Sequence, residues 1–189
     1  MPETELWKKA FLEYTRNQEV VSKWVNLALT QTIRRTVETA VDLVEVEQYP
    51  PDAVTLGFSP QVLIAALAAR LKQGLTPSIT VVTSPEVERG EPRVAYNSHL
   101  ILKAALKEGL VENLVITNMS PKPSLPPDKV IGEATSKLAK LKENNVGIVD
   151  ISGGTQLIPL ALIKAGITSM TYTYPNGEKT IIYYFKVNP

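Results

Sequence analysis

The sequence has no cysteine and only one histidine, His99. Without cysteine there is no disulfide bond, no thiolate nucleophile and no zinc site of the cysteine type, and the composition fits a reducing compartment. A single histidine cannot form a histidine-cluster metal site, and no acidic motif at ligand spacing accompanies it. We therefore expect no metal or other cofactor, and we interpret His99 as a structural residue near the start of a helix.

Net charge and long apolar runs are also lacking. The 20 Lys and Arg residues face 19 Asp and Glu residues, which leaves a formal net charge of +1. Such a balance creates no field that follows a nucleic-acid backbone, so any bound anion must be held by local groups. The longest apolar runs are too short to span a membrane, and the amino-terminal stretch lacks the basic-then-apolar order of a secretion signal. We expect a cytoplasmic protein without a membrane partner.

What is present is an ordinary globular composition, with 44% hydrophobic and 21% charged residues among 189. It supports one substantial core with a smaller attachment. Residues 1–50 form a helical segment in this interpretation, because Leu6, Trp7 and Phe11 share one helical stripe and a second amphipathic pattern follows. The tail of this segment, residues 43–49, alternates by twos and is also compatible with a strand.

From Asp52 onward, apolar runs alternate with helical patterns. We expect strands at 53–58, 78–84, 113–118 and 146–152, and helices at 59–74, 97–109, 126–145 and 155–164. Ser59 is the expected N-cap of the first of these helices and Asn97 or Ser98 that of the second, and Gly74 and Gly109 are expected to end them. A hairpin with its turn at Asn176-Gly177 follows and adds an antiparallel edge. The fold class is α/β: residues 51–189 form a Rossmann-like three-layer sandwich with a mostly parallel sheet.

The loops that follow the strands are the expected binding site. In such sheets, ligands bind beyond the carboxyl ends of the strands, near the point where the strand order reverses. The loop Ser152–Gln156 is the most specific, because two glycines permit close backbone approach to an anion and Thr155 adds a hydroxyl at a helix start. The loop Gly57–Pro60 is weaker, since Gly57 can serve a tight turn alone. The four loops expected at this edge are 57–60, 83–93, 117–124 and 152–156.

Catalytic motifs are scarce. No dinucleotide fingerprint and no P-loop occurs, so neither NAD nor a P-loop nucleotide is indicated, and no Ser-His-Asp arrangement can be assembled. Asp150 is a candidate base, but a carboxylate at a strand end more often accepts hydrogen bonds from a neighbouring loop. Arg89, Arg93 and Lys122 are candidates for a phosphate contact, although loop charges are usually solvated.

Four tyrosines gather in the expected hairpin strands. We interpret them as packing residues, with stacking on bases as the alternative. They are Tyr172, Tyr174, Tyr183 and Tyr184.

Two of the loops carry a resemblance to a known family. The stretch Gly57-Phe58-Ser59-Pro60 after the first strand and Asp150-Ile151-Ser152-Gly153-Gly154-Thr155 after the fourth, with the closing hairpin, resemble the CRISPR-associated Rossmann fold (CARF) family. The resemblance covers residues 53–189. It implies a homodimer that holds a cyclic oligoadenylate, the second messenger of type III CRISPR antiviral defence, across its two-fold axis. The ligand contacts expected on this basis are Gly57, Phe58, Ser59, Pro60, Ser84, Asn118, Ser152, Gly153, Gly154, Thr155 and Gln156.

Some members of this family also cleave the ring by attack of a ribose 2′-hydroxyl on the adjacent phosphate. In that case Ser59 is the expected catalytic residue. The position after Gly-Thr is commonly Lys in the family, whereas it is Gln156 here, and a neutral amide cannot offset developing phosphate charge. The resemblance therefore favours a sensor or scavenger over a metal-independent ring nuclease. A Rossmann-like module that binds another nucleotide, or only protein, is the third hypothesis.

The first 50 residues have two interpretations. Dimer packing or contact with a partner is the favoured one. The pair Arg34-Arg35 leaves DNA binding open as the other.

Overall fold

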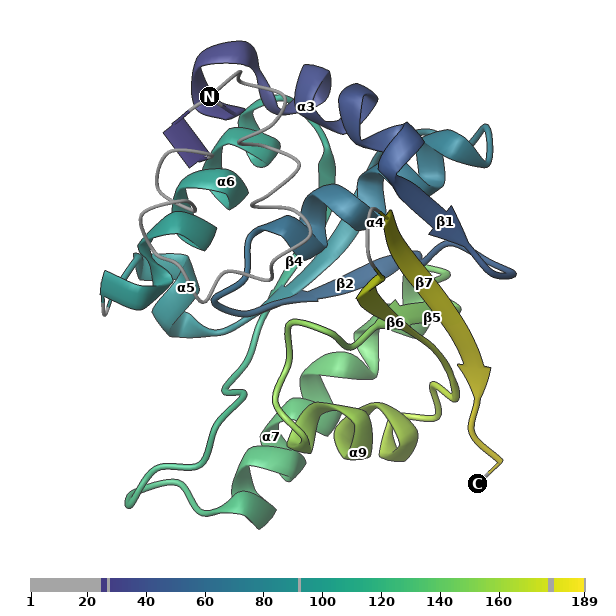
Figure 1. Ribbon diagram of the computed structural model, residues 1–189. Coiled ribbons are helices and arrows are strands. Elements are labelled where there is room, and N and C mark those ends of the chain that lie inside the picture. Colours follow the sequence, from purple (N-terminus) through teal and green to yellow (C-terminus); the bar gives the residue numbers. More distant parts are fainter. Residues whose placement is uncertain (1–24, 27, 92, 177–178, 189) are drawn as a thin grey trace.

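The computed structural model describes residues 25–26, 28–91, 93–176 and 179–188, which form one sheet covered by helices (Figure 1). The predicted first helix with Leu6, Trp7 and Phe11 lies outside the described residues. The sheet has seven strands in the described part of the chain, in the order β1-β7-β6-β5-β2-β3-β4. The strands are β1 (Val44–Val46), β2 (Ala53–Leu56), β3 (Ile79–Thr83), β4 (Val111–Ile116), β5 (Ile148–Asp150), β6 (Ser169–Asn176) and β7 (Lys179–Lys186).

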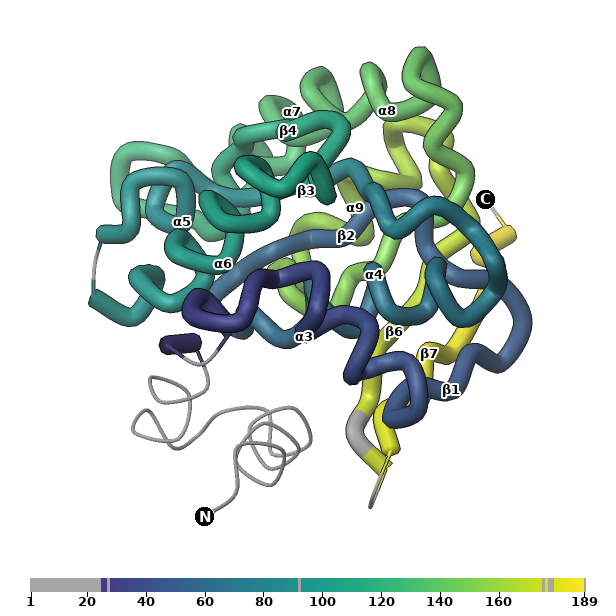
Figure 2. Tube along the Cα trace, turned by 90° about the horizontal axis from the view of Figure 1, so that it is seen from above, coloured from purple at the N-terminus to yellow at the C-terminus, as the bar shows by residue number. Residues whose placement is uncertain are grey.

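Helices cover both faces of this sheet, as Figures 1 and 2 show. One face packs against α3 (Ile33–Ala40), α4 (Gln61–Lys72), α5 (Pro85–Arg89) and α6 (Tyr96–Lys107). The other packs against α7 (Pro127–Leu138), α8 (Lys140–Glu143) and α9 (Leu157–Lys164). Short 3-10 turns at Val41–Leu43 and Arg93–Ala95 precede β1 and α6. The three-layer α/β fold is therefore confirmed.

The strand order reverses between β2 and β5. From β2 the chain moves outward to β3 and β4, then returns to β5 on the other side of β2 and continues to β6. These five strands are parallel, so their carboxyl ends share one edge. The β2–β5 boundary at that edge is the switch point, where doubly wound sheets bind their ligands.

The hairpin prediction is confirmed in its pairing but wrong in its position. β6 and β7 pair antiparallel from Ser169↔Lys186 to Asn176↔Lys179, and the two connecting residues lie outside the described part. The edge strand, however, is β1, which pairs in parallel with β7. Within the alternating tail at 43–49, residues 44–46 form a strand, which buries Val44 in the core and extends the sheet by one strand.

Two predicted helix caps are wrong. α4 begins at Gln61 with Pro60 as its N-cap residue, and no side chain caps it. Pro60 already has helical φ and ψ of −65° and −25°, so the turn closes on backbone carbonyls and leaves the Ser59 hydroxyl outside. α6 begins at Tyr96, because the 3-10 turn before it leads directly into the helix and places Asn97 and Ser98 inside. The predicted stops at Gly74 and Gly109 are confirmed by their φ values of +73° and +69°.

One predicted loop contains a helix. The segment 83–93 includes α5, whose N-cap Ser84 accepts a hydrogen bond from the Val87 N–H at 3.4 Å. Pro85 at the first helical position and acidic residues in the first turn are the signals that indicate this helix in the sequence.

The described part of the amino-terminal segment packs on the same core as the sheet. Val25, Ile33 and Val37 are buried with the residues of α4. The Glu108 carboxylate, just after α6, accepts hydrogen bonds from the Ile33 and Arg34 N–H groups at 2.8 and 2.9 Å and so caps α3. Residues 25–26 and 28–46 therefore pack as one body with the residues that follow them.

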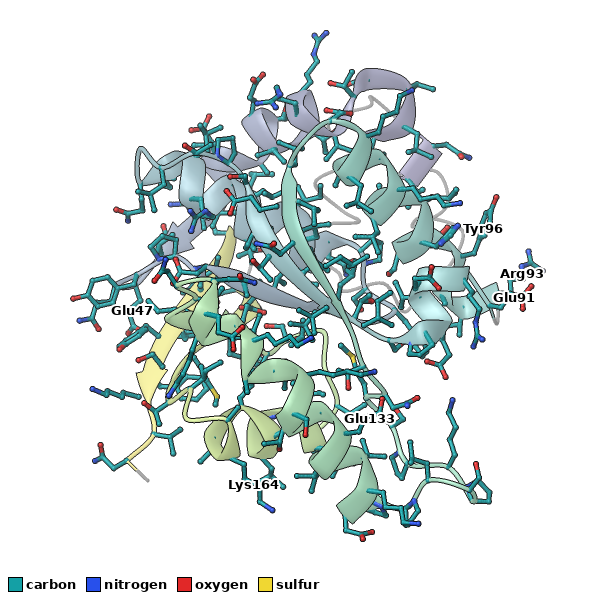
Figure 3. The ribbon with its side chains drawn as sticks, turned by 180° about the vertical axis from the view of Figure 1, so that it is seen from behind. Glu47, Glu91, Arg93, Tyr96, Glu133 and Lys164 are labelled. Atoms are coloured by element: carbon teal, nitrogen blue, oxygen red, sulfur yellow. The ribbon has the colours of Figure 1, made fainter. Side chains whose placement is uncertain are left out.

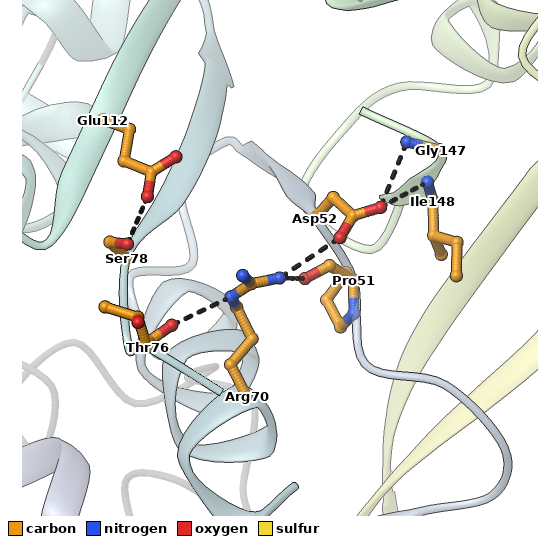
Figure 4. A network of polar contacts seen from close by, with 8 residues as sticks. All are labelled: Pro51, Asp52, Arg70, Thr76, Ser78, Glu112, Gly147 and Ile148. Atoms are coloured by element: carbon orange, nitrogen blue, oxygen red, sulfur yellow. Dashed lines mark hydrogen bonds and ion pairs between the residues drawn. The ribbon is translucent and has the colours of Figure 1, made fainter. Parts of the chain in front are cut away.

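A polar clamp joins the strand starts at the edge opposite the switch point (Figure 4). One Asp52 oxygen accepts hydrogen bonds from the Gly147 and Ile148 N–H groups, both at 3.0 Å, and the other accepts from Arg70 at 3.2 Å. Arg70 also donates to the carbonyls of Pro51 and Thr76. The clamp ties β2, β5 and the end of α4 together.

Removing this carboxylate should destabilise the fold. We expect Asp52→Ala to lower the free energy of unfolding by about 1–2 kcal/mol, because two backbone N–H groups and Arg70 lose their acceptor. Urea denaturation measures this loss. Glu45→Ala is the matched control, since the Glu45–Lys179 pair lies on the exposed surface, where ion pairs contribute little. Equal urea midpoints for the two variants would show that the clamp does not stabilise the sheet.

Candidate functional site

The loops Gly57–Pro60 and Ser152–Gln156 meet at the switch point, because β2 and β5 are neighbours in the sheet. A Cβ atom on Gly57 would overlap the Gly153 carbonyl oxygen and lie 3.2 Å from its carbon. A Cβ atom on Gly153 would overlap the Thr55 carbonyl oxygen and lie 2.9 Å from the Gly57 nitrogen. Both positions require glycine because the two loops touch through their backbones.

Asp150 holds the second loop in shape. One of its oxygens accepts a hydrogen bond from the Ser152 N–H at 2.9 Å, and the other accepts from the hydroxyls of Thr171 and Thr173 at 3.0 and 2.8 Å. The Ser152 hydroxyl in turn accepts from the Thr173 N–H at 2.6 Å. Burial raises the pKa of Asp150, and the hydrogen bonds from these neighbours oppose that rise. Asp150 is fully buried, so it serves as the acceptor for a loop and not as a solvent-facing base.

Several hydrogen-bond donors at this edge are unused. Within the described part of the chain, the backbone N–H groups of Phe58, Ser59, Gly153, Thr155 and Gln156 make no hydrogen bond, and neither does the Ser59 hydroxyl. They lie where α4 and α9 begin, and helix starts favour negative charge. Phe58 is 49% exposed beside them. We call these five N–H groups and the Ser59 hydroxyl the cradle, since unpaired donors at helix starts are of the kind that bind anions.

Two buried polar side chains border the same cradle. The Thr55 hydroxyl, 3.2 Å from where a Gly154 Cβ would lie, has no hydrogen-bond partner within the structure. The Gln61 side-chain amide, directly after Pro60, also lacks a partner at both polar atoms, although the residue is only 2% exposed. Unpaired buried polar groups cost about 1–3 kcal/mol each. In the described part of the chain, the hydroxyls of Ser98, Thr117 and Thr180 are also buried without a partner, so this feature is not particular to the cradle. Neither Thr55 nor Gln61 was predicted from the sequence, because each lies inside an apolar run.

Three predicted ligand contacts already have structural roles. The Thr155 hydroxyl donates to the Met119 carbonyl and ties the loop after β4 to the switch point. The Asn118 amide donates to Glu133 at 2.9 Å, and Glu133 also pairs with Lys137 at 2.7 Å. Ser84 caps α5 and is only 6% exposed.

The remaining predicted contacts lie in the two loops that meet. Pro60 is buried beneath the cradle, while Gln156 is exposed at its rim. Ser152 and Gly154 are partly buried between the two. The structure thus brings together residues 57–60 and 152–156, and it places Ser84 and Asn118 in supporting positions.

The loop cations lie in the segments that follow β3 and β4. Lys122 forms an ion pair with Glu86 at 2.7 Å and so joins the loops after β3 and β4. Arg89 and Arg93 are exposed, and Figure 3 shows Arg93 with Glu91 and Tyr96 at one end of the molecule, opposite Glu47. His99 Nδ1 donates to the Val87 carbonyl at 3.1 Å, which confirms its structural role. The stretches 57–60 and 152–156 themselves contain no Lys or Arg, so the donors that they supply are neutral.

Two hollows of the described surface lie elsewhere. One of about 640 Å³ separates α3 from the carboxyl half of α6, and one of about 440 Å³ lies beside β1 and β7. Neither includes a residue of the four loops. Among the residues that the structure describes, no three acidic or histidine side chains gather as a metal site.

Within the described ranges, no helix is long and apolar enough to cross a bilayer. Comparison of the sequence with protein-family models and with curated proteins finds no match to either.

Proposed function

We propose that this protein binds a cyclic oligoadenylate at the switch point and acts as a sensor or scavenger in type III CRISPR defence. The observation that supports it is the backbone contact between Gly57 and Gly153, which unites two donor-rich loops at the switch point. Unused N–H groups suit phosphate oxygens, and the Ser59 hydroxyl suits a sugar or base edge. The choice of a cyclic oligoadenylate as the ligand rests on the resemblance of these two loops to the CARF family.

A two-fold dimer suits a cyclic ligand made of repeated nucleotides. One chain presents one cradle, and a two-fold axis presents it twice in matching orientation. A ring with repeated phosphates then meets the same donors on both sides.

The second candidate function is ring cleavage. It is favoured by the unpaired Ser59 hydroxyl, which is free to align a ribose for attack on the adjacent phosphate. It is disfavoured by Gln156, since the transition state gathers negative charge that a neutral amide cannot offset.

The test is incubation of the purified protein with labelled cyclic tetra-adenylate and cyclic hexa-adenylate. We expect one ring to be retained without linear products. Ser59→Ala should weaken its binding about 5-fold, since a neutral hydrogen bond contributes about 1 kcal/mol. Ser136→Ala, an exposed serine on α7, removes the same atom outside the four loops and should leave binding unchanged.

Other outcomes distinguish the alternatives. Linear products that disappear in Ser59→Ala would establish the ring nuclease. If the protein retains neither ring but a mononucleotide raises its melting temperature, the ligand is another nucleotide and not a cyclic oligoadenylate. Equal affinity of Ser59→Ala and the natural protein would remove Ser59 from the site.

A further inference from the structure

Aromatic side chains are exposed on the β6–β7 hairpin. Tyr172, Tyr174, Tyr183 and Phe185 are 44%, 51%, 39% and 37% exposed. The packing role predicted for the first three is therefore not fulfilled within the described part of the chain. Tyr184 packs as predicted, since its ring meets Tyr49 edge to face at 5.1 Å between centroids.

The hairpin rises beyond the carboxyl end of β5. Asp150, the last residue of β5, is opposite Thr171, and β6 continues from there to Asn176. Residues 172–176 thus extend about 16 Å above this edge of the sheet, at about 3.3 Å per residue. The loop Ser152–Gln156 begins at the same edge, so the upper half of the hairpin stands beside this loop.

Tyr172 and Tyr174 lie on this upper half, on either side of Thr173. The Thr173 N–H donates to the Ser152 hydroxyl at 2.6 Å, so the strand residue between the two tyrosines contacts the loop directly. Met170 is buried with residues of α9, and alternate residues of a strand share a face, which places both tyrosines on the α9 side. Because α9 follows directly after the loop, the loop leads to the side where the two aromatic rings are exposed.

An exposed aromatic side chain lies on the other flank of the cradle as well. Phe58 follows β2 and is 49% exposed, and β2 lies on the opposite side of β5 from β6. The strand order thus places the loop after β5 between two aromatic groups. Neutral N–H donors suit a phosphate, and exposed aromatic rings suit a planar apolar surface. A nucleotide has both parts, since bases stack on aromatic side chains while the backbone carries the charge.

The size of the aromatic patch favours a small ligand over a protein partner. The exposed parts of the four hairpin side chains amount to about 400 Å², roughly half of the ~800 Å² that each partner of a standard protein interface buries. Tyr172 and Tyr174, which lie nearest to the loop, supply about half of this area.

We propose that Tyr172 and Tyr174 form a base-stacking subsite, on which an adenine of the ligand lies while its phosphate occupies the cradle. This inference rests on the proposed function and extends the site from the phosphate to the base. In a cyclic oligoadenylate the bases project outward from the closed chain of riboses and phosphates, so a ligand held at the loop Ser152–Gln156 directs a base toward the hairpin. Neither tyrosine is among the contacts that the family resemblance implies.

The test is the affinity of the full chain for labelled cyclic tetra-adenylate and cyclic hexa-adenylate, measured by fluorescence polarisation. We expect Tyr174→Leu to weaken binding of the retained ligand about 10-fold, the loss typical of one stacked base. Tyr174→Phe keeps the aromatic ring and should bind nearly as tightly as the natural protein. Phe185→Leu is the matched control, because Phe185 lies on the same side but opposite Met170, below the loop, and it should leave binding unchanged.

Photo-crosslinking gives a readout of position. A cyclic ligand that carries 8-azidoadenine should label the tryptic peptide 165–179, which contains both tyrosines, and the label should decrease in Tyr174→Leu. Thermal melting establishes that each variant is folded. If Tyr174→Leu fails to fold, Tyr172→Leu takes its place.

The possible results separate this inference from the proposed function. Unchanged affinity of Tyr172→Leu and Tyr174→Leu, together with weaker binding by Ser59→Ala, overturns the stacking subsite, leaves the proposed function intact and assigns the aromatic patch to another partner. A loss in Tyr174→Phe as large as that in Tyr174→Leu assigns the effect to the hydroxyl and also overturns stacking. If the natural protein retains neither cyclic ligand, the proposed function fails and this inference fails with it.

Discussion

Replacement of Gly153 by alanine is expected to lower the free energy of unfolding by about 3 kcal/mol, the upper range for overpacking of a close-packed site. The added Cβ atom would overlap the Thr55 carbonyl oxygen and approach its carbon to 3.0 Å and the Gly57 nitrogen to 2.9 Å. These are backbone atoms of β2 and its loop, and they cannot rotate away as a side chain would. Relief requires β2 and β5 to separate at the switch point. Chemical denaturation followed by circular dichroism measures the loss.

Gly132→Ala is the matched control for this experiment. Gly132 lies in the interior of α7, and a Cβ atom there would meet nothing within 4 Å. The same one-carbon addition should therefore stabilise the protein by about 0.5–1 kcal/mol, since alanine favours a helix more than glycine does. Equal denaturation midpoints for Gly153→Ala and the natural protein would contradict the loop contact.

The second large effect is expected at Asp150. Asp150→Ala should cost about 3 kcal/mol or more, because the Ser152 N–H and two threonine hydroxyls lose their acceptor inside the protein. Asp150→Asn keeps the size and one acceptor, and the threonine hydroxyls can turn to accept from its amide. We therefore expect the asparagine variant to retain most of the stability that the alanine variant loses.

The stability of the natural protein and that of Asp150→Asn should also depend differently on pH. Burial raises the pKa of Asp150 above its unfolded value, so the folded state binds more protons between the two pKa values. The contribution of Asp150 to stability is thus fully present below the unfolded pKa and declines as the pH rises from about 4 toward the folded pKa. The free energy of unfolding of the natural protein, relative to Asp150→Asn, should fall over that range.

Glu133→Gln should show the opposite dependence: relative to this variant, the free energy of unfolding of the natural protein should rise with pH. Hydrogen bonds from Lys137 and Asn118 hold the pKa of Glu133 below its usual range, so its stabilisation is present above the unfolded pKa and is lost as the pH falls. Urea denaturation at a series of pH values and constant salt measures both differences. A difference between Asp150→Asn and the natural protein that is independent of pH would show that Asp150 does not titrate as described.

Most of the architecture is predictable from the sequence, since it depends on periodicity. Continuous apolar runs such as Ile79–Thr83 are typical of strands buried on both faces, and Gly74 and Gly109 end their helices by adopting positive φ. The position of β1 is not predictable in this way. Its three residues pair with β7, about 135 positions later in the chain, and no local pattern indicates a contact across that separation.

The site is predictable in location but not in detail. The Gly-rich loops lie where strand alternation places them. The reason for Gly57 and Gly153, however, is contact between two loops that are 96 positions apart, which a pattern within either loop cannot reveal. The alternation of threonine and tyrosine in β6 is a signal that Thr171 and Thr173 share one side, yet the buried acceptor on that side, Asp150, belongs to another strand.

The two margins of the sheet also limit how copies of this chain can aggregate. At one margin β1 offers only three residues to a further strand, and at the other β4 exposes Glu112 and Asn113 beside an irregular register at Ile79 and Thr80. Short, charged or irregular margins resist the strand-by-strand growth that leads to fibrils. A chain that meets another copy at either margin therefore finds few backbone groups with which to extend the sheet.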